Sequence, residues 1–192
     1  MATTSKAAKS QDMDQICQGD IFQNVKYSYI DYEDDKDVNI IEYEFPLALI
    51  VSQACDVIAM DEIMSKKGGK PSKFMPAILM CPIYACDAAK SGKHIQDAFN
   101  ELGLRFEQEN TFQKDDYKVA TRDWHYRIHA LTVESDEKIV IEDAVVDFKH
   151  YFTVPMSYLV SHKCDRLLHL EDLFAEQITL KFSTYLARVA IP

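Results

Sequence analysis

Two short apolar runs constrain the fold of this chain more than any other feature of its sequence. Residues Leu47–Val51 and Ala77–Cys81 are continuously apolar. Each run is too short for an independent helix, and the lack of alternating polar residues is typical of a strand that is covered on both faces. We therefore expect two central strands, Leu47–Ser52 and Pro76–Pro82, with packed layers on either side.

Other patterns add strands and helices around this pair. The acidic run Tyr32–Asp37 is flanked by apolar residues, which predicts a hairpin with a solvated tip. Helical spacing predicts one helix from Ile95 through Phe106 and another from Leu170 towards the end of the chain. Further strands are expected at His125–Glu134, Lys138–Glu142 and Val145–Val154. The whole pattern indicates an α+β fold with peripheral helices and a C-terminal helix.

The length of 192 residues fits one domain. Residues 1–15 are polar and show no apolar period, so we expect a flexible tail there and a single domain over residues 16–192. The sequence shows neither a secretory signal nor an apolar run of membrane-spanning length. A cytoplasmic location is therefore expected.

The net charge limits the classes of partner, and the cysteine content indicates the redox state of the thiols. The formal net charge of −10 repels polyanions at long range, so any contact with nucleic acid must be local, and no interaction with an anionic membrane is expected. Five scattered cysteines, an odd number, indicate reduced thiols rather than a disulfide framework. No cofactor is expected.

Three short motifs follow one another in a defined order. Gly19-Asp20-Ile21 comes first, Pro46–Ser52 follows the acidic run, and Ala77–Ile83 ends in Pro-Ile. This series resembles the PemK/MazF family of toxin endoribonucleases, which are small SH3-like barrels. The resemblance covers roughly residues 19–84. It implies an SH3-like or PemK-like β-barrel core.

Two positions depart from the family's pattern. In that family Arg usually precedes the Pro-led strand and Thr follows the Pro-Ile pair, and both side chains are implicated in cutting the RNA backbone. Here Phe45 and Tyr84 stand at those positions. Loss of a fixed cation where negative charge develops costs about 3 kcal/mol or more of transition-state stabilisation. The departure argues against ribonuclease activity of the family type.

The end of the first apolar strand carries Ser52, Gln53, Cys55 and Asp56. One hypothesis makes Cys55 a nucleophile activated by a histidine that the sequence does not identify, with Ser52 or Gln53 binding substrate. In the other, Cys55 fills the end of the barrel and Asp56 caps the turn or a short helix at Val57–Met64. We favour the second hypothesis, because thiolate catalysis needs a neighbouring base.

A basic and aromatic cluster comprises Arg122, Trp124, His125, Arg127 and His129. Strand alternation would put His125, Arg127 and His129 on one face, where they would bind phosphate while Trp124 stacks on a base. The same pattern suits an amphipathic strand with Trp124 in the core, and Trp and Arg are also common anchors of protein interfaces. We favour the amphipathic strand.

Two further patterns are weaker. Cys81, Cys86 and His94 lack the regular spacing and the fourth ligand of a structural zinc site, so no metal is expected. The stretch Ser65–Lys73 contains glycines and lysines but not the spacing of a nucleotide-binding loop, and we interpret it as a solvated loop.

The sequence favours a non-enzymatic or catalytically degenerate PemK/MazF-like barrel that acts as a binding or regulatory component of a bacterial toxin or anti-phage defence system. The alternative is a nuclease whose catalytic residues differ from those of the family and comprise Arg122, His125, Arg127 and His129. A third hypothesis is an interaction subunit that docks through an exposed apolar stripe of its final helix. A protein partner is expected, and a homodimer is compatible with the sequence.

Overall fold

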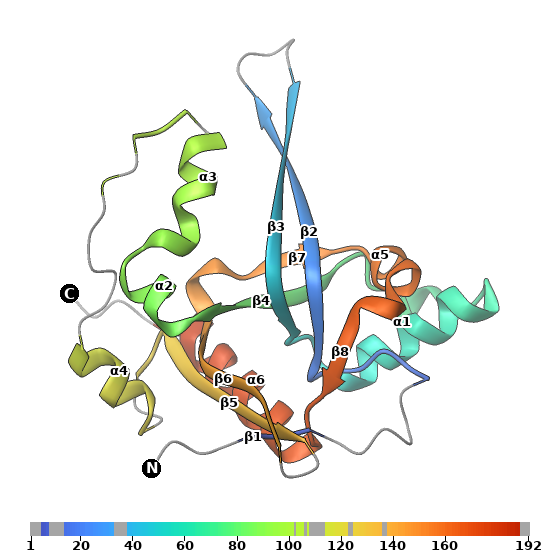
Figure 1. Ribbon diagram of the computed structural model, residues 1–192. Coiled ribbons are helices and arrows are strands. Elements are labelled where there is room, and N and C mark those ends of the chain that lie inside the picture. Colours follow the sequence, from blue (N-terminus) through green and yellow to red (C-terminus); the bar gives the residue numbers. More distant parts are fainter. Residues whose placement is uncertain are drawn as a thin grey trace.

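The computed structural model of this chain describes residues 5–7, 14–32, 38–101, 103–105, 107, 114–122, 125–135 and 138–188. In this part of the chain, an eight-stranded sheet is accompanied by six α-helices (Figure 1). The strands are β1 (Ser5–Lys6), β2 (Asp20–Tyr32), β3 (Val38–Ile50), β4 (Ile78–Ala85), β5 (Ile128–Ser135), β6 (Lys138–Asp147), β7 (Phe152–Val154) and β8 (Arg166–His169). The helices are α1 (Ala54–Lys66), α2 (Cys86–Lys90), α3 (Gln96–Glu101), α4 (Lys114–Ala120), α5 (Met156–Ser161) and α6 (Asp172–Leu186).

The strands follow the order β1-β5-β6-β4-β3-β2-β8, and β7 pairs with β4. All pairs are antiparallel except β1 with β5. The end strands β1 and β8 are not paired with each other, although Ala7 forms an isolated bridge with Leu170 and the Glu171 N–H donates to the Lys6 carbonyl oxygen at 2.9 Å. The expected α+β class is confirmed, and the described strands form an open sheet rather than a closed barrel.

Strands β3 and β4 contain the two apolar runs and lie side by side, as the sequence predicted. Leu49 and Cys81 belong to the core cluster that includes the buried face of α6. Ile50 and Met80, one residue along each strand, belong to the cluster that includes residues of α1 and α5. The runs are continuously apolar because both faces of these strands are covered.

Strands β2 and β3 form a long ribbon that projects from the rest of the molecule (Figure 1). Their register runs without a shift from Ile21 opposite Leu49 to Tyr32 opposite Val38. Strand β4 pairs with β3 only from Leu47 to Ile50, and the described chain pairs no other strand with that edge of β3. Most of the expected acidic tip, residues 33–37, lies outside the described residues.

Two sequence expectations about strands were wrong. The expected strand Val145–Val154 is interrupted, because β6 ends at Asp147, a 3-10 turn covers Phe148–His150, and β7 begins at Phe152. The strand expected to begin at His125 begins at Ile128 instead.

The helices also differ in detail from the expectations. Helix α1 begins at Ala54 with Gln53 at the N-cap position, so Asp56 lies in the first turn and does not cap the helix. Helix α3 follows a 3-10 turn at Lys93–Ile95 and ends at Glu101. The helix expected to run through Phe106 is shorter than predicted, because residues 103–105 are not helical; Leu102 and Phe106 themselves lie outside the described residues.

The C-terminal helix is confirmed as α6, and its outer face is apolar at two points. Leu173 and Leu180 are 71% and 69% exposed, whereas Ile178 and Phe182 are buried. Within the described residues, no helix is both long and apolar enough to cross a membrane.

Part of the stretch 1–15, expected to be a flexible tail, is a strand. Ser5 and Lys6 form β1 and pair in parallel with Val133 and Glu134 of β5. Residues 1–4 and 8–13 lie outside the described residues.

The start of β2 packs closely on α6 through Gly19. This residue has φ +90°, and a Cβ atom there would lie 2.6 Å from the Cβ of Ala175 in α6. Both the backbone conformation and the close approach therefore require glycine.

We expect Gly19→Ala to lower the free energy of unfolding by about 1–3 kcal/mol, through backbone strain and overpacking. Urea denaturation will measure this loss. Gly68→Ala is the matched control, because a Cβ at Gly68 meets no atom within 4 Å and its φ is not positive. Equal stabilities of the two variants would contradict the packing argument.

Candidate functional site

A cleft of about 900 Å³ lies between the edge of β3, the end of β4 and the segment from α2 to α3. Its aromatic lining consists of Tyr27, Tyr43, Phe45, Tyr84, Tyr151 and Phe152. The exposed charged residues along it are Glu42, Glu44, Asp97 and Glu142, with Lys93 as the one lysine or arginine in the described lining. The cleft is therefore aromatic within and acidic at its rim.

The interruption between β6 and β7 reaches this cleft. Strand β6 pairs with β4 as far as Val146 opposite Ile83, and β7 resumes with Phe152 opposite Met80. The five residues 147–151 therefore lie opposite only two residues of β4. The extra length turns out of the sheet as a 3-10 turn, which brings His150 to the cleft.

Pro82 explains where the interruption occurs. The Val51 N–H donates to the Leu79 carbonyl oxygen at 3.0 Å across the β3–β4 pair. Antiparallel alternation then turns the backbone of Cys81 towards β3 and that of Pro82 towards β6 and β7. Because proline has no N–H to donate, a continuous strand opposite Pro82 would lose a ladder hydrogen bond.

Asp147, at the end of β6, is held by a two-point ion pair. Arg127 donates from Nε to Oδ1 at 2.9 Å and from Nη2 to Oδ2 at 2.6 Å, and the Lys149 N–H donates to Oδ1 at 3.0 Å. Burial alone would raise the pKa of Asp147, but these hydrogen bonds and the nearby positive charge lower it below the ordinary value. Asp147 is therefore an ionised carboxylate.

His150 lies beside this carboxylate. Its Nδ1 is 3.3 Å from Asp147 Oδ2 and 3.5 Å from the Tyr84 hydroxyl oxygen. Burial lowers the pKa of His150 to about 4, so the ring is neutral at pH 7. A neutral imidazole beside a carboxylate carries its proton on the facing nitrogen, here Nδ1. Burial raises the pKa of Tyr84, which keeps that hydroxyl protonated.

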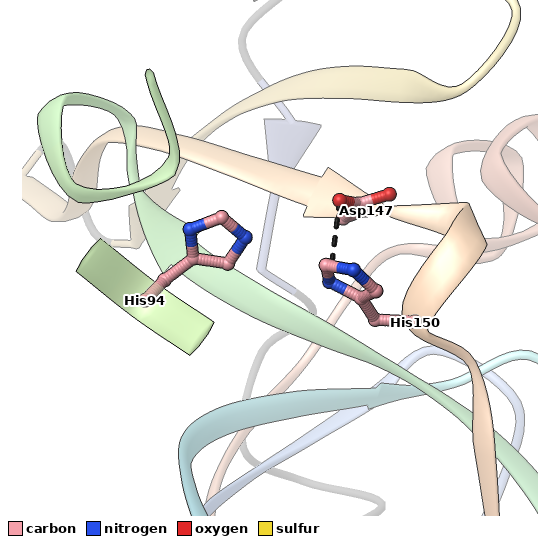
Figure 2. A group of neighbouring side chains, drawn as sticks. All are labelled: His94, Asp147 and His150. Carbon is pink, nitrogen blue, oxygen red and sulfur yellow. Dashed lines mark ion pairs between the residues drawn. The ribbon is translucent and has the colours of Figure 1, made fainter. Parts of the chain in front are cut away.

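His94 approaches the same place from the 3-10 turn Lys93–Ile95 (Figure 2). Its Nδ1 lies 3.2 Å from the Ala88 carbonyl oxygen, and because a carbonyl only accepts, Nδ1 carries the proton. The other nitrogen, Nε2, is buried and has no hydrogen-bond partner among the described residues. Burial lowers the pKa of His94, and its ring centroid lies 5.4 Å from that of His150.

The group therefore offers two neutral imidazoles, one carboxylate and one fixed guanidinium. One ligand atom from each of His94, Asp147 and His150 lies within 4.8 Å of the others, and these are atom types that bind transition metals. A neutral imidazole is also a general base. Both kinds of chemistry are available at the cleft.

The residues predicted around Cys55 lie elsewhere, since none of them lines the cleft. Ser52 is buried and accepts a hydrogen bond from the Leu79 N–H at 2.8 Å, which is a structural role. The expectation that Cys55 fills the end of the barrel was wrong, because Gln53 and Cys55 are both exposed at the start of α1. The Cys55 sulfur lies 3.7 Å from Asp56 Oδ1. No histidine hydrogen bond or ring contact to Cys55 is present in the described structure.

The residues of the predicted basic cluster do not share one surface. Arg127 turns to Asp147, whereas His129 is 5% exposed, with its Nδ1 3.1 Å from Lys181 Nζ. His125 accepts hydrogen bonds through Nδ1 from the Arg127 and Ile128 N–H groups, at 3.2 and 3.0 Å. The exposed Arg122 follows α4, and Trp124 lies outside the described residues.

Sequence reasoning missed Asp147 and His150, and it considered His94 only beside Cys81 and Cys86. Burial raises the pKa of both thiols, which disfavours the thiolate form that binds zinc. The signal that could have revealed the site is Pro82, whose missing N–H predicts a defect in the neighbouring strand.

No protein-family model, curated protein or solved structure matches this chain. Its function is therefore inferred from the chemistry of the cleft.

We expect acidification from pH 7 to pH 4.5 to destabilise the fold through His150. The pKa of His150 in the folded chain, about 4, lies below the ordinary value of 6.5. Between these two pH values the unfolded chain binds more protons than the folded chain, so the free energy of unfolding decreases as the pH is lowered. The full shift corresponds to about 3 kcal/mol at most.

Urea denaturation at both pH values, in buffer that contains a chelator, will measure this dependence. His150→Gln should reduce the loss of stability on acidification. His162→Gln is the control, because His162 lies against the Tyr158 carbonyl oxygen and does not line the cleft. The same pH dependence in both variants would show that His150 is not the responsible group.

Proposed function

We propose that the protein is a non-enzymatic binding component whose cleft receives an extended, positively charged segment of a partner protein. One observation carries this proposal. The edge of β3 without a strand partner in the described structure runs alongside an aromatic cleft with an acidic rim.

The strand edge supplies main-chain recognition. Leu47 turns its backbone groups towards β4, and alternation along β3 turns those of Phe45 towards the same side, where no described strand pairs with them. An exposed strand edge is a template for an added strand. An extended segment would bind there by main-chain hydrogen bonds, as in other cases of β-augmentation.

The cleft supplies side-chain recognition. The ring of Phe45 stacks on that of Phe152 with centroids 4.4 Å apart, and Tyr151, which lines the same cleft, is 44% exposed. Such rings accept apolar side chains and the stems of Lys and Arg, and ring faces attract cations. The excess of carboxylates at the rim complements a segment that carries Lys or Arg.

The resemblance to the PemK/MazF family supports the same proposal. Phe45 and Tyr84, which stand where the family has Arg and Thr, both line the cleft. A relative of that family that has exchanged a cation and a small hydroxyl for two aromatic rings would retain a binding surface and lose phosphate chemistry. We propose that such a protein acts as a binding or regulatory component of a bacterial toxin or anti-phage defence system.

Hydrolysis of nucleic acid is a second candidate function. It is favoured by the neutral rings of His94 and His150 beside the guanidinium of Arg127, which are groups able to accept a proton and to stabilise a phosphorane charge. Arg127, however, is engaged by Asp147, and the rim carboxylates repel a phosphodiester. Binding of a positively charged segment is therefore the better supported function.

Selection from a random library of displayed nine-residue peptides will test the binding function. We expect the selected peptides to be rich in Lys or Arg and apolar residues, and to protect the Phe45 amide from hydrogen exchange. The double variant Glu42→Lys/Glu44→Lys should weaken binding of a selected synthetic peptide by at least about tenfold, because it reverses charge at the rim.

The matched control is Glu62→Lys/Glu176→Lys, which changes the net charge equally at exposed positions of α1 and α6. Calorimetry will compare the affinities at one salt concentration. Peptides without a charge preference, or equal affinities of the two double variants, would contradict a peptide site at this edge.

Incubation with mixed pools of RNA and DNA will separate the two candidate functions. We expect the wild-type chain to leave both pools intact. Site-preferring cleavage that His150→Gln abolishes and the control His162→Gln preserves would replace the binding function by the nuclease.

A further inference from the structure

We propose that His94, Asp147 and His150 bind one divalent transition-metal ion. This proposal does not rest on the binding of a partner segment, because none of the three residues belongs to β3: Asp147 and His150 flank the break in the sheet, and His94 lies on the 3-10 turn Lys93–Ile95. It assigns the cluster a ligand that the sequence spacing did not suggest.

The ligand atoms are close to the arrangement that one ion requires. Two ligands of a tetrahedral zinc ion, each about 2.0–2.2 Å from the metal, are about 3.3–3.6 Å apart. The distance between His150 Nδ1 and Asp147 Oδ2 is 3.3 Å. All separations in the group are at most 4.8 Å, so an inward movement of His94 by no more than about 1.5 Å would complete the site.

His94 is prepared for this role by its surroundings. Metal-binding histidines commonly donate their other ring N–H to a carboxylate or a backbone carbonyl, which fixes the ring and its tautomer. His94 does so through Nδ1, towards the Ala88 carbonyl oxygen. The remaining lone pair, on Nε2, is buried without a partner among the described residues, which is costly unless a ligand satisfies it.

Asp147 is held in the same manner as a metal-binding carboxylate. Its position is fixed by Arg127 and by the Lys149 N–H, as second-sphere groups fix ligands elsewhere. The metal would replace the proton between Asp147 and His150, and His150 would stay neutral by carrying its proton on Nε2 instead. The nearby guanidinium opposes a second positive charge, so we expect a modest affinity.

The donor set selects the class of metal. Two imidazole nitrogens and one carboxylate oxygen suit zinc, cobalt, nickel or ferrous ion. Calcium and magnesium prefer sites made wholly of oxygen atoms. The cluster should therefore bind Zn²⁺ and Co²⁺ and should discriminate against Mg²⁺ and Ca²⁺.

Titration of the chelator-treated full chain with Zn²⁺ and with Co²⁺ will test the site. Cys55→Ser/Cys164→Ser serves as the background, because both exposed thiols are competing ligands. We expect one equivalent of metal by calorimetry and visible absorption from bound Co²⁺. His94→Gln and His150→Gln should each weaken binding by at least about tenfold, whereas His162→Gln should not.

A second measurement needs no substitution in the cluster, so it tests the site even if the histidine variants fail to fold. In ¹H–¹⁵N spectra of the histidine rings, Zn²⁺ should shift the signals of His94 and His150 and leave that of His162 unchanged. Absence of binding, or saturation with Zn²⁺ without shifts of His94 and His150, would overturn the proposal. The metal-site proposal is independent of nuclease activity and of peptide binding, so a negative result in either of those experiments does not contradict it.

Discussion

Strand β4 is paired on both edges and covered on both faces, and Pro82 within it limits how the neighbouring strand can pair. The apolar run of β4 must stay buried, so water cannot replace the hydrogen bond that Pro82 is unable to donate. The ladder is broken instead, and five residues stand opposite two. The resulting 3-10 turn brings His150 beside Asp147, and Arg127 compensates the charge of Asp147 through an ion pair. A local backbone constraint thus creates the polar group at the cleft.

The Gly-Asp-Ile motif has a physical role that is separate from any activity. Gly19 allows β2 to approach α6, and Asp20, 1% exposed, accepts hydrogen bonds from the Cys17 N–H at 2.8 Å and from Arg166 at 3.2 Å. His169 Nδ1 lies 2.8 Å from the same carboxylate. These contacts tie the start of β2 to β8. A motif that serves packing and charge compensation indicates a fold more directly than a function.

The sequence predicted the elements whose signal is local. The apolar runs of β3 and β4 and the helical period of α6 record burial directly, so both were recognised. The break at Asp147 was missed because its cause, Pro82, lies in another strand, and apolar residues continue on both sides of the break. His94 and His150 are far apart in sequence, and only pairing with β4 brings them together. The alternation assumed for His125, Arg127 and His129 failed because β5 begins later, at Ile128.

The contacts of Arg127 indicate which kind of ligand the cleft binds. A guanidinium that holds a phosphate in a two-point contact needs two free N–H groups directed at it. Here Nε and one N–H of Nη2 hold Asp147, whose side chain is buried, and Arg127 is not among the residues that line the cleft. Withdrawing Arg127 from Asp147 would leave a buried charge uncompensated. Arg127 therefore fixes the carboxylate and does not serve the cleft as a cation. With carboxylates at its rim and aromatic rings within, the cleft favours a positively charged ligand over a phosphodiester.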